Sequence, residues 1–340
     1  MSEALGTLDA PVLVLADLDG TRPTDPALEL VAVARTLTGG DGGDGSDVVA
    51  LTLGPVEAEA SAALAAAGAN RLLVADLGGE RAQAAAGADA VVAAVHEVAP
   101  GAVLVSSDYR GKETAGRAAV LLDSACVSDV ADLRVADGAL HASRLVLSGS
   151  WSTTMSASVH AERPPILAVR PGSVEVPDAS AGDAAPLPGE ALEVAVSREA
   201  AAVRLVSRES TAAAAGPDLA GARTVVVGGR GVDGDFDLVR SLAEPLGAAV
   251  GATRVACDEE WIERSAQIGQ TGVSIAPRLY IGLGVSGAIH HTSGIQGAGT
   301  IVAVCDDSEA PIFEMADFGV VGDVTEVVPQ LVAELDRLRG

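Results

Sequence analysis

Between Gly251 and Asp323 the chain repeatedly places a glycine-containing turn directly after a run of apolar residues. The apolar runs have the length and composition of buried parallel strands. Each turn carries one or two polar side chains, as in GATR, QIGQTG and GVSGAIHH. In an open α/β sheet, such turns lie at the carboxyl ends of the strands, where nucleotides and dinucleotides bind. This stretch therefore predicts a nucleotide or dinucleotide site.

The first half of the chain alternates strand and helix patterns, which indicates βαβ units and a largely parallel sheet. The predicted elements are a strand at Pro11–Ala16, a helix beginning at Pro26, and then alternating strands and helices at Asp47–Leu53, Val56–Ala67, Arg71–Ala75, Ala82–Val98, Ala102–Ser106 and Lys112–Asp123. Shorter strand-like pieces follow at Asp129–Val135, Ala139–Gly149, Pro165–Val169, Glu193–Val196 and Val203–Val206.

A second α/β pattern begins after the small, proline-containing segment Ala212–Asp218, which we take as the boundary between domains. Its predicted elements are strands at Thr224–Val227, Leu279–Leu283 and Ile301–Val304 and helices at Asp237–Leu246 and Val324–Leu338, with Asp323 as a cap of the last helix. Loops are expected at Gly39–Ser46 and Asp178–Pro188. The fold class is α/β with two domains, residues 1–211 and 212–340.

Composition excludes several classes of protein. The 340 residues carry a net charge of −25, and phosphates would be repelled, so nucleic-acid binding is not expected. The three cysteines form no CxxC pair, and His96, His141 and His160 have no ligand spacing, so neither a disulfide framework nor a metal site is expected. No apolar run reaches the ~20 residues of a membrane span, and no secretory signal is present, so a cytoplasmic protein is expected.

Polar residues at Ser107–Glu113 follow a predicted strand and suggest either an anion site or a simple helix cap; the cap is the favoured interpretation. In the second half, Arg230 follows a strand and two glycines, where a guanidinium can bridge a phosphate. Ser286 and the amides of Gly287 and Ala288 open a predicted helix, where they would point at an anion.

The ordered blocks VVVGGRG, LGAAVGATR, QIGQTG, LYIGLGVSGAIHHTSGIQ, IVAVCDDSEAPIF and ADFGVVGD closely resemble the alpha subunit of the electron transfer flavoproteins. The resemblance is dense from Thr224 to about Leu331, and the N-terminal block VLVSSDYRGKETAGRAAVLLDSACVSD resembles the family more loosely. It implies an N-terminal nucleotide-hydrolase-like α/β domain with a parallel sheet, a C-terminal Rossmann-like domain holding FAD, and a beta subunit that forms a heterodimer with the chain.

The resemblance also implies roles for individual residues. Arg230, Ser286, Gly287 and Ala288 would lie along the pyrophosphate and ribityl chain of FAD, and Asp323 toward the adenosine. Thr271 would lie near flavin N5, with Gln267, Ile268, Gly269 and Gln270 along the same edge. His291 would face the O2 and N1 side, and Arg254, with Thr253, the ring. A donor or cation there, such as His291 or Arg254, would stabilise the negative charge that reduction brings. For Arg254 a structural salt bridge, and for Thr271 a helix cap, remain alternatives.

Four positions depart from the family pattern. Thr253 replaces a usual Ser and keeps the hydroxyl, and His290 replaces a common Gln, which adds a titratable group beside His291. Cys305 and Asp306 stand where the family typically has Asn-Lys, so an amide and a cation are lost near the dinucleotide. Weaker or rearranged contacts are therefore expected at the adenosine end.

The resulting hypothesis is an electron carrier without substrate chemistry of its own. It would accept electrons from primary flavin dehydrogenases, such as the acyl-CoA dehydrogenases of fatty acid β-oxidation, and pass them to a membrane-bound quinone reductase without entering the membrane. Two alternatives stay open: a subunit of an NADH-using electron-bifurcating flavoprotein, and a nucleotide-binding structural subunit whose FAD binding is weakened by Cys305 and Asp306.

Overall fold

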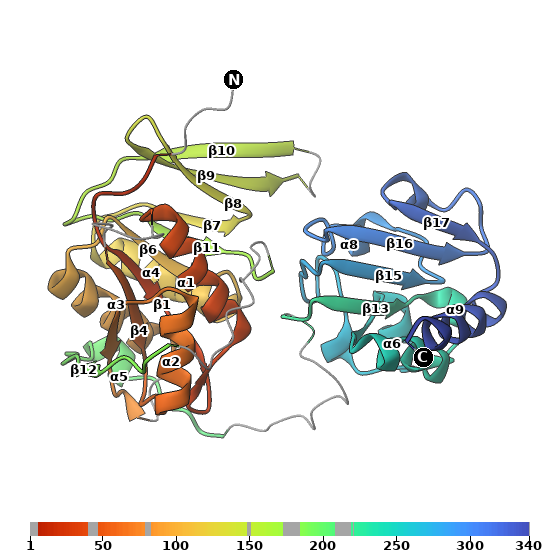
Figure 1. Ribbon diagram of the computed structural model, residues 1–340, viewed down its shortest axis with the longest axis horizontal. Helices are drawn as coiled ribbons and strands as arrows, with labels where there is room; N and C mark the ends of the chain where they lie inside the picture. The colour runs from red at the N-terminus through yellow and green to blue at the C-terminus, as the bar shows by residue number, and fades with distance from the viewer. Residues whose placement is uncertain are drawn as a thin grey trace. The chain divides into compact units, whose positions relative to one another are not determined.

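The computed structural model of the chain describes residues 6–39, 47–78, 83–147, 151–172, 184–207, 219 and 221–339. The chain divides into two compact units (Figure 1). The N-terminal unit comprises residues 1–146 and 151–209, and the C-terminal unit comprises residues 147–150 and 210–340. Both units are built on a parallel sheet, so the predicted α/β fold class is confirmed.

The N-terminal unit contains a parallel sheet with the strand order β12-β5-β4-β1-β6-β11-β7. Its strands are β1 (Val12–Leu15), β4 (Val48–Thr52), β5 (Arg71–Val74), β6 (Ala102–Ser106), β7 (Cys126–Val130), β11 (Ile166–Val169) and β12 (Gly189–Ala191). The central strands β1, β4 and β6 are buried along their whole length, because helices cover both faces of the sheet.

The side chains of β1 alternate between the two faces. Val12 and Val14 pack with the side chains of α1 (Asp25–Leu37) and α2 (Ala58–Ala67), whereas Leu13 and Leu15 pack with those of α3 (Ala84–Val98) and α4 (Tyr109–Leu121). Helix α1 begins where the sequence predicts, because Thr24 accepts a hydrogen bond from the amide of Ala27. The result is a doubly wound sheet.

Three further features complete this unit. Strands β8 (Asp132–Ala136), β9 (Ala139–Val146) and β10 (Trp151–Ala157) form an antiparallel sheet. A small hairpin joins β2 (Leu18–Asp19) to β3 (Arg22–Pro23), and the single-turn helix α5 spans Arg198–Ala201.

The C-terminal unit contains a parallel sheet with the order β14-β13-β15-β16-β17. Its strands are β13 (Thr224–Gly228), β14 (Ala249–Ala252), β15 (Leu279–Leu283), β16 (Thr300–Cys305) and β17 (Phe318–Val321). Its helices are α6 (Phe236–Leu246), α7 (Arg254–Asp258), α8 (Ile289–Thr292) and α9 (Val324–Arg339), with short 3-10 turns η2 (Arg230–Val232), η3 (Arg264–Ala266) and η4 (Pro311–Glu314).

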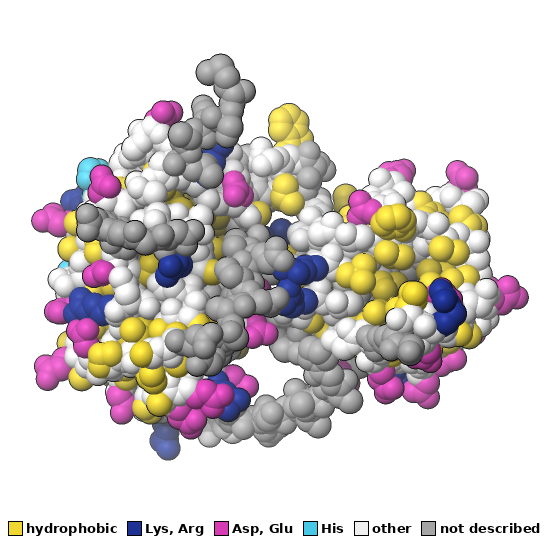
Figure 2. Space-filling view, viewed as in Figure 1, with side chains coloured by type: hydrophobic (Ala, Val, Ile, Leu, Met, Phe, Trp, Pro, Cys, Tyr) yellow, Lys and Arg dark blue, Asp and Glu magenta, His cyan; other side chains and the backbone are white. Residues whose placement is uncertain are grey.

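The two faces of this second sheet are covered differently. Helices α6 and α9 cover one face through residues such as Leu242 and Val328. The other face is covered by Ile268, Ile275 and Ile295, which belong to turns and connecting segments rather than to long helices. The edge strand β17 is exposed at all four residues, and hydrophobic side chains appear on this surface in Figure 2.

Several sequence predictions need correction. Glu193–Val196 and Val203–Val206 are not strands, whereas β10, β14 and β17 were not predicted. Helix α4 begins at Tyr109 rather than at Lys112, because Asp108 caps it by accepting from the amide of Gly111 at 2.6 Å. The favoured interpretation of Ser107–Glu113 as a helix cap is therefore confirmed.

Other predictions lie partly or wholly outside the described residues. These are the loop at Gly39–Ser46, most of the loop at Asp178–Pro188, and the boundary segment Ala212–Asp218. In the described part of the chain, no helix combines the length and the apolar character needed to cross a bilayer. The same residues contain no cluster of three His, Cys, Asp or Glu side chains suited to a metal ion.

Candidate functional site

The switch point of the C-terminal sheet lies between β13 and β15, because the chain leaves β13 toward β14 on one side and returns to β15 on the other. Two glycine turns meet there, backbone against backbone. The amide of Gly229 donates to Leu283 O at 2.8 Å, and that of Gly231 donates to Gly284 O at 3.0 Å. A Cβ on Gly229 would lie 2.3 Å from Gly284 O, so no side chain fits between the turns.

The four residues predicted for a phosphate-bearing chain lie at this switch point. Arg230 is exposed at the start of η2 and follows β13, while Ser286, also exposed, follows β15. Gly287 has φ +83°, and a Cβ there would lie 2.3 Å from the Ile312 amide nitrogen. Ala288 precedes α8. The structure brings the two predicted turns together at one edge of the sheet.

Thr253 and Arg254 follow the neighbouring strand β14. The hydroxyl oxygen of Thr253 is buried and has no hydrogen-bond partner among the described residues, although this residue occupies the N-cap position of α7. Arg254 is 63% exposed along its side chain and donates to Asp258 at 3.1 Å, within the same helix. The salt-bridge interpretation of Arg254 thus applies within α7, and an exposed pair of this kind contributes little to stability.

The segment from Gln267 to Val273 folds into a tight turn. Gln267 is 3% exposed and donates from Nε2 to Thr271 Oγ1 at 2.8 Å, while its Oε1 is buried and has no partner in the described part of the chain. Ile268 is buried, and Gly269 has φ +134°, which disfavours any other residue. No helix begins at Thr271, so the helix-cap interpretation of this residue is wrong.

Helix α8 packs on this turn through its two histidines. The exposed His290 places Nδ1 2.7 Å from Gln270 Oε1. His291 is 5% exposed, with Nδ1 3.1 Å from Ile268 O and Nε2 2.8 Å from the hydroxyl of Tyr280. Burial lowers the pKa of His291 to about 4, so it is neutral at pH 7 and the predicted set of residues takes its positive charge from Arg230 and Arg254.

The predicted adenosine side lies at the ends of β16 and β17. Cys305 is the last residue of β16 and is buried, and Asp306 follows it on the surface. Asp323 is exposed and accepts from both the hydroxyl and the amide of Thr325, which lowers the pKa of its carboxyl group. These bonds make Asp323 the cap of α9, as the sequence predicts.

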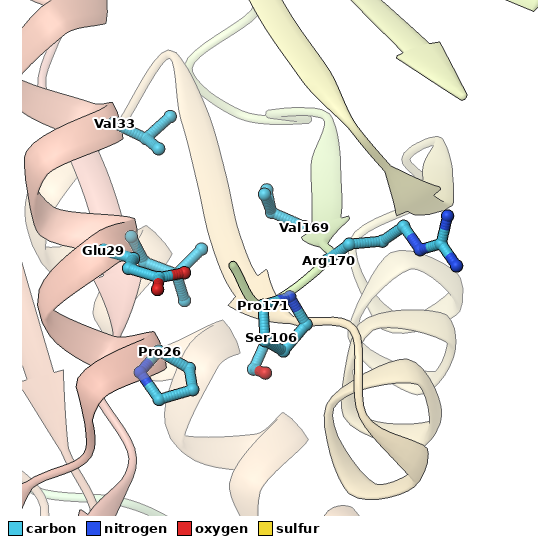
Figure 3. A pocket seen from close by; sticks show the side chains of 8 residues that line it. Pro26, Glu29, Val33, Ser106, Val169, Arg170 and Pro171 are labelled. Carbon is cyan, nitrogen blue, oxygen red and sulfur yellow. The ribbon is translucent and has the colours of Figure 1, made fainter. Parts of the chain in front are cut away.

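The switch point of the N-terminal sheet, between β1 and β6, is filled by charged side chains instead. Asp17 pairs with Arg110, and Lys112 lies 2.7 Å from Asp129. Beside it, Glu29 accepts from the amide of Gly172 at 2.6 Å. Figure 3 shows the hollow next to Glu29, and the guanidinium of Arg170 points away from this hollow. The hollow is too narrow for a water molecule.

Tyr280, whose hydroxyl contacts His291, was not predicted from the sequence. It is fully buried on β15 and faces the same side of the sheet as Ile268 and Ile295. The sequence LYIGL does contain an indication of this residue. Because side chains alternate along a strand, the Tyr280 hydroxyl, the one polar side-chain group of LYIGL, must lie on a single face of the sheet.

Two family models match the chain. The electron transfer flavoprotein domain matches residues 12–201, and the electron transfer flavoprotein FAD-binding domain matches residues 218–296. An electron transfer flavoprotein subunit alpha from Mycobacterium leprae is 41% identical over 255 residues, which cover 74% of this chain and 76% of the relative. The chain belongs to the electron transfer flavoprotein alpha-subunit family.

Other members of the family extend the similarity to almost the whole chain. The electron transfer flavoprotein subunit alpha of Bacillus subtilis is 33% identical over 332 residues, covering 96% of this chain and 98% of the relative. The mitochondrial alpha subunit of Arabidopsis thaliana is 37% identical over 244 residues. The FAD-binding family model spans the switch point, the Gln267–Val273 turn and helix α8, which supports a flavin cofactor in this unit.

The residues at the C-terminal switch point fit a flavin nucleotide. Buried polar atoms in proteins are nearly always hydrogen-bonded, so the unpartnered Thr253 Oγ1 and Gln267 Oε1 indicate missing partners. A flavin ring offers donors and acceptors along its polar edge. The meeting glycine backbones and the neighbouring Arg230 suit its phosphates.

Proposed function

We propose that this chain is the FAD-binding subunit of a heterodimeric electron carrier. It would pair with an electron transfer flavoprotein beta subunit, accept electrons from primary flavin dehydrogenases such as acyl-CoA dehydrogenases, and deliver them to a membrane-bound quinone reductase. The observation that carries the proposal is the pair of unpartnered buried oxygens, Thr253 Oγ1 and Gln267 Oε1, beside the glycine switch point of a unit that matches the FAD-binding family model.

Each group at this site has a separate task in the proposal. Bound FAD supplies the one-electron redox chemistry. Arg230 neutralises phosphate charge where the glycine turns let a pyrophosphate approach, and Ser286, Gly287 and Ala288 supply further polar contacts. Thr253 and Gln267 satisfy the polar groups of the ring, with Gly269, Gln270 and Thr271 along the same turn.

Charge near the ring sets how readily an electron is accepted. Arg254 is the cation that the family resemblance places at the ring, and it already pairs with Asp258. His291 stays neutral, and both of its ring nitrogens already bond within the chain, to Ile268 O and to the hydroxyl of Tyr280, so it brings neither a charge nor a free donor to the ring. No side chain of the set serves as a nucleophile or a general base, which suits a protein that moves electrons without transforming a substrate.

The adenosine side has fewer polar contacts in the proposal. Cys305 is buried with its sulfur 3.9 Å from Asp306 Oδ1, and Asp323 already caps α9. We expect FAD to be held mainly by the switch point and the Gln267–Val273 turn rather than by the adenosine contacts.

Thr253 provides the direct test, because its buried hydroxyl has no partner without the ligand. Wild type, Thr253→Ala and Thr253→Ser are each prepared as the full chain co-expressed with its beta subunit. The FAD affinity of each complex is then measured by titration. Thr253→Ala should weaken FAD binding about tenfold, equivalent to about 1.4 kcal/mol, whereas Thr253→Ser should bind FAD as wild type does.

The same titration separates the alternatives. A complex that retains no flavin absorbance after excess FAD is removed would contradict both the electron-carrier and the electron-bifurcating hypotheses. It would leave the structural-subunit hypothesis. A complex whose flavin is reduced directly by NADH would favour an electron-bifurcating relative over the simple carrier. Equal FAD affinity for Thr253→Ala and wild type would remove Thr253 from the site.

A further inference from the structure

Tyr280 is the largest fully buried side chain of the C-terminal unit. It is the second residue of β15, the strand on one side of the switch point, and its phenolic oxygen lies 2.8 Å from His291 Nε2. The two rings are tilted by 53°, with their centroids 6.1 Å apart, so the hydroxyl and not the ring face makes the contact. None of the roles assigned above involves this hydroxyl.

The direction of the hydrogen bonds follows from the groups themselves. Ile268 O is a carbonyl and can only accept, so His291 Nδ1, at 3.1 Å, carries the hydrogen. The imidazole is neutral, so Nε2 has no hydrogen and accepts. Tyr280 is therefore the donor. Its burial raises the pKa of the phenol, so the hydroxyl keeps its proton.

This chain of bonds ends in the turn that carries the ring contacts. Ile268 belongs to the Gln267–Val273 turn, whose Gln270 amide also donates to His290 O at 2.7 Å. A Cβ on Gly269 would lie only 2.2 Å from His290 O, so the turn and helix α8 are in direct backbone contact. Tyr280, on a strand of the sheet, fixes the position of both.

We infer that Tyr280 is a positioning residue of the flavin site: its buried hydroxyl holds His291 as the Nδ1–H tautomer, and His291 in turn holds the Gln267–Val273 turn through Ile268 O. The inference rests on the proposed function only for the identity of the ligand. The arrangement itself belongs to the chain and exists before any flavin binds. Thr271, 2.8 Å from Gln267 Nε2, is the group whose position this support determines.

The first test uses the wild-type, flavin-free full chain. Selective ¹⁵N labelling of its five histidines reports which ring nitrogen of His291 is protonated. We expect a single neutral Nδ1–H form that does not titrate between pH 5.5 and 8. An Nε2–H form, or a titration near the ordinary histidine pKa of about 6.5, would overturn the inference whether or not the chain binds FAD.

The second test compares Tyr280→Phe with Tyr109→Phe. These are the two tyrosines of the chain, and Tyr109 is 89% exposed on α4, so it controls for the chemical change itself. In flavin-free Tyr280→Phe, amides of Gln270 and Val273 should exchange hydrogen about tenfold faster, which corresponds to about 1.4 kcal/mol of local support. The hydrogen exchange rates of the β13 amides should be unchanged in Tyr280→Phe. Tyr109→Phe should show wild-type exchange rates at all of these amides.

A purely structural role for Tyr280 would give a different result. Equal acceleration of exchange in β13, α6 and the Gln267–Val273 turn would show that the hydroxyl stabilises the whole unit, and unchanged exchange in the turn would show that it supports nothing there. Either result would overturn the inference. FAD affinity of the co-expressed complex should fall about fivefold in Tyr280→Phe, with Tyr109→Phe as the control.

Discussion

Each unit of this chain contains a parallel sheet with a switch point, but different groups lie at the two switch points. At the N-terminal switch point, side chains of opposite charge pair with one another: Asp17 with Arg110, and Lys112 with Asp129. At the C-terminal switch point, glycine backbones meet and polar side-chain atoms remain without partners.

The difference shows why a fold alone does not specify a ligand site. A parallel sheet brings the ends of two strands together in both units, as a binding site requires. The N-terminal unit uses the space for its own ion pairs. Burial raises the pKa of Asp17, although the nearby Arg110 acts to lower it. Burial also acts to raise the pKa of Asp129, but hydrogen bonding and charge from Lys112 outweigh it, and the pKa of Asp129 is lowered. The C-terminal unit instead leaves Thr253 Oγ1 and Gln267 Oε1 without a hydrogen-bond partner among the described residues.

The largest expected effect tests the glycine contact itself. Gly284 has φ +62°, and a Cβ there would lie 2.5 Å from the Cα of Gly231. Gly284→Ala should cost about 4 kcal/mol of unfolding free energy in the C-terminal unit, from the left-handed backbone and the backbone clash together. Urea unfolding followed by Trp261 fluorescence, in a Trp151→Phe background, measures it.

Gly247→Ala is the matched control, since Gly247 has φ +58° but nothing within 4 Å of its would-be Cβ. Gly247→Ala should lower the unfolding free energy by only about 1 kcal/mol, because it adds the strain of a left-handed backbone but no steric clash. If both substitutions cost the same, close backbone approach at the switch point contributes nothing.

Removing the charge pair of the N-terminal unit should have the next largest effect. Arg110→Met leaves Asp17, whose side chain is 13% exposed, without its cation. The unfolding free energy of that unit should fall by about 3 kcal/mol, read as lost hydrogen-exchange protection in β1 and β6. FAD affinity should not change.

Arg22→Met is the control for Arg110→Met. Arg22 pairs with Glu59, but both side chains are largely exposed, so the loss should be about 0.5 kcal/mol or less. An Arg110→Met variant as stable as Arg22→Met, or one that gains affinity for FAD or AMP, would mean that the ion pair does not occupy the N-terminal switch point in the way described.

The smallest of the three effects comes from pH. His291 has a pKa of about 4 in the folded chain, below the ordinary value of 6.5, so the unfolded chain binds a proton first as pH falls. This contribution to stability is fully present above pH 6.5 and is lost toward pH 4. Between pH 7 and pH 5, wild type should lose about 2 kcal/mol relative to His291→Gln, by urea unfolding at each pH.

The exposed His160 serves as the reference for this measurement. His160→Gln should track wild type at every pH, because this exposed substitution leaves His291 and its partners Ile268 and Tyr280 unchanged. A wild-type curve parallel to that of His291→Gln would show that His291 is protonated as readily in the folded chain as in the unfolded chain.

Continuous apolar runs made most of the fold predictable. Leu279–Leu283 and Ala102–Ser106 are strands to the residue, and all their residues are buried except the half-buried Leu279. Val203–Val206 has the same β-branched composition, yet Val206 is 91% exposed and forms no strand, because composition does not reveal whether a neighbouring strand is available. The polar strand β10 was missed for the opposite reason: its pairing with β9, and not its composition, makes it a strand.

The site was predictable to the level of its turns. Residues that follow parallel strands meet at one edge, so Arg230 and Ser286 were expected together, and the structure places both turns at the switch point. The contact between Tyr280 and His291 joins a strand to a helix eleven residues later, and its geometry depends on how α8 packs. The unpartnered oxygens of Thr253 and Gln267 likewise appear only when every neighbour is in place.

The unequal cover of the C-terminal sheet has a kinetic consequence. Long helices α6 and α9 pack on one face, while turns and the four-residue helix α8 cover the face that carries Tyr280 and the Gln267–Val273 turn. Segments of this kind open with a smaller free energy than long packed helices. We therefore expect the turn-covered face to open locally while the α6–α9 face stays folded, and a cofactor held by the Gln267–Val273 turn would then exchange faster than the unit unfolds.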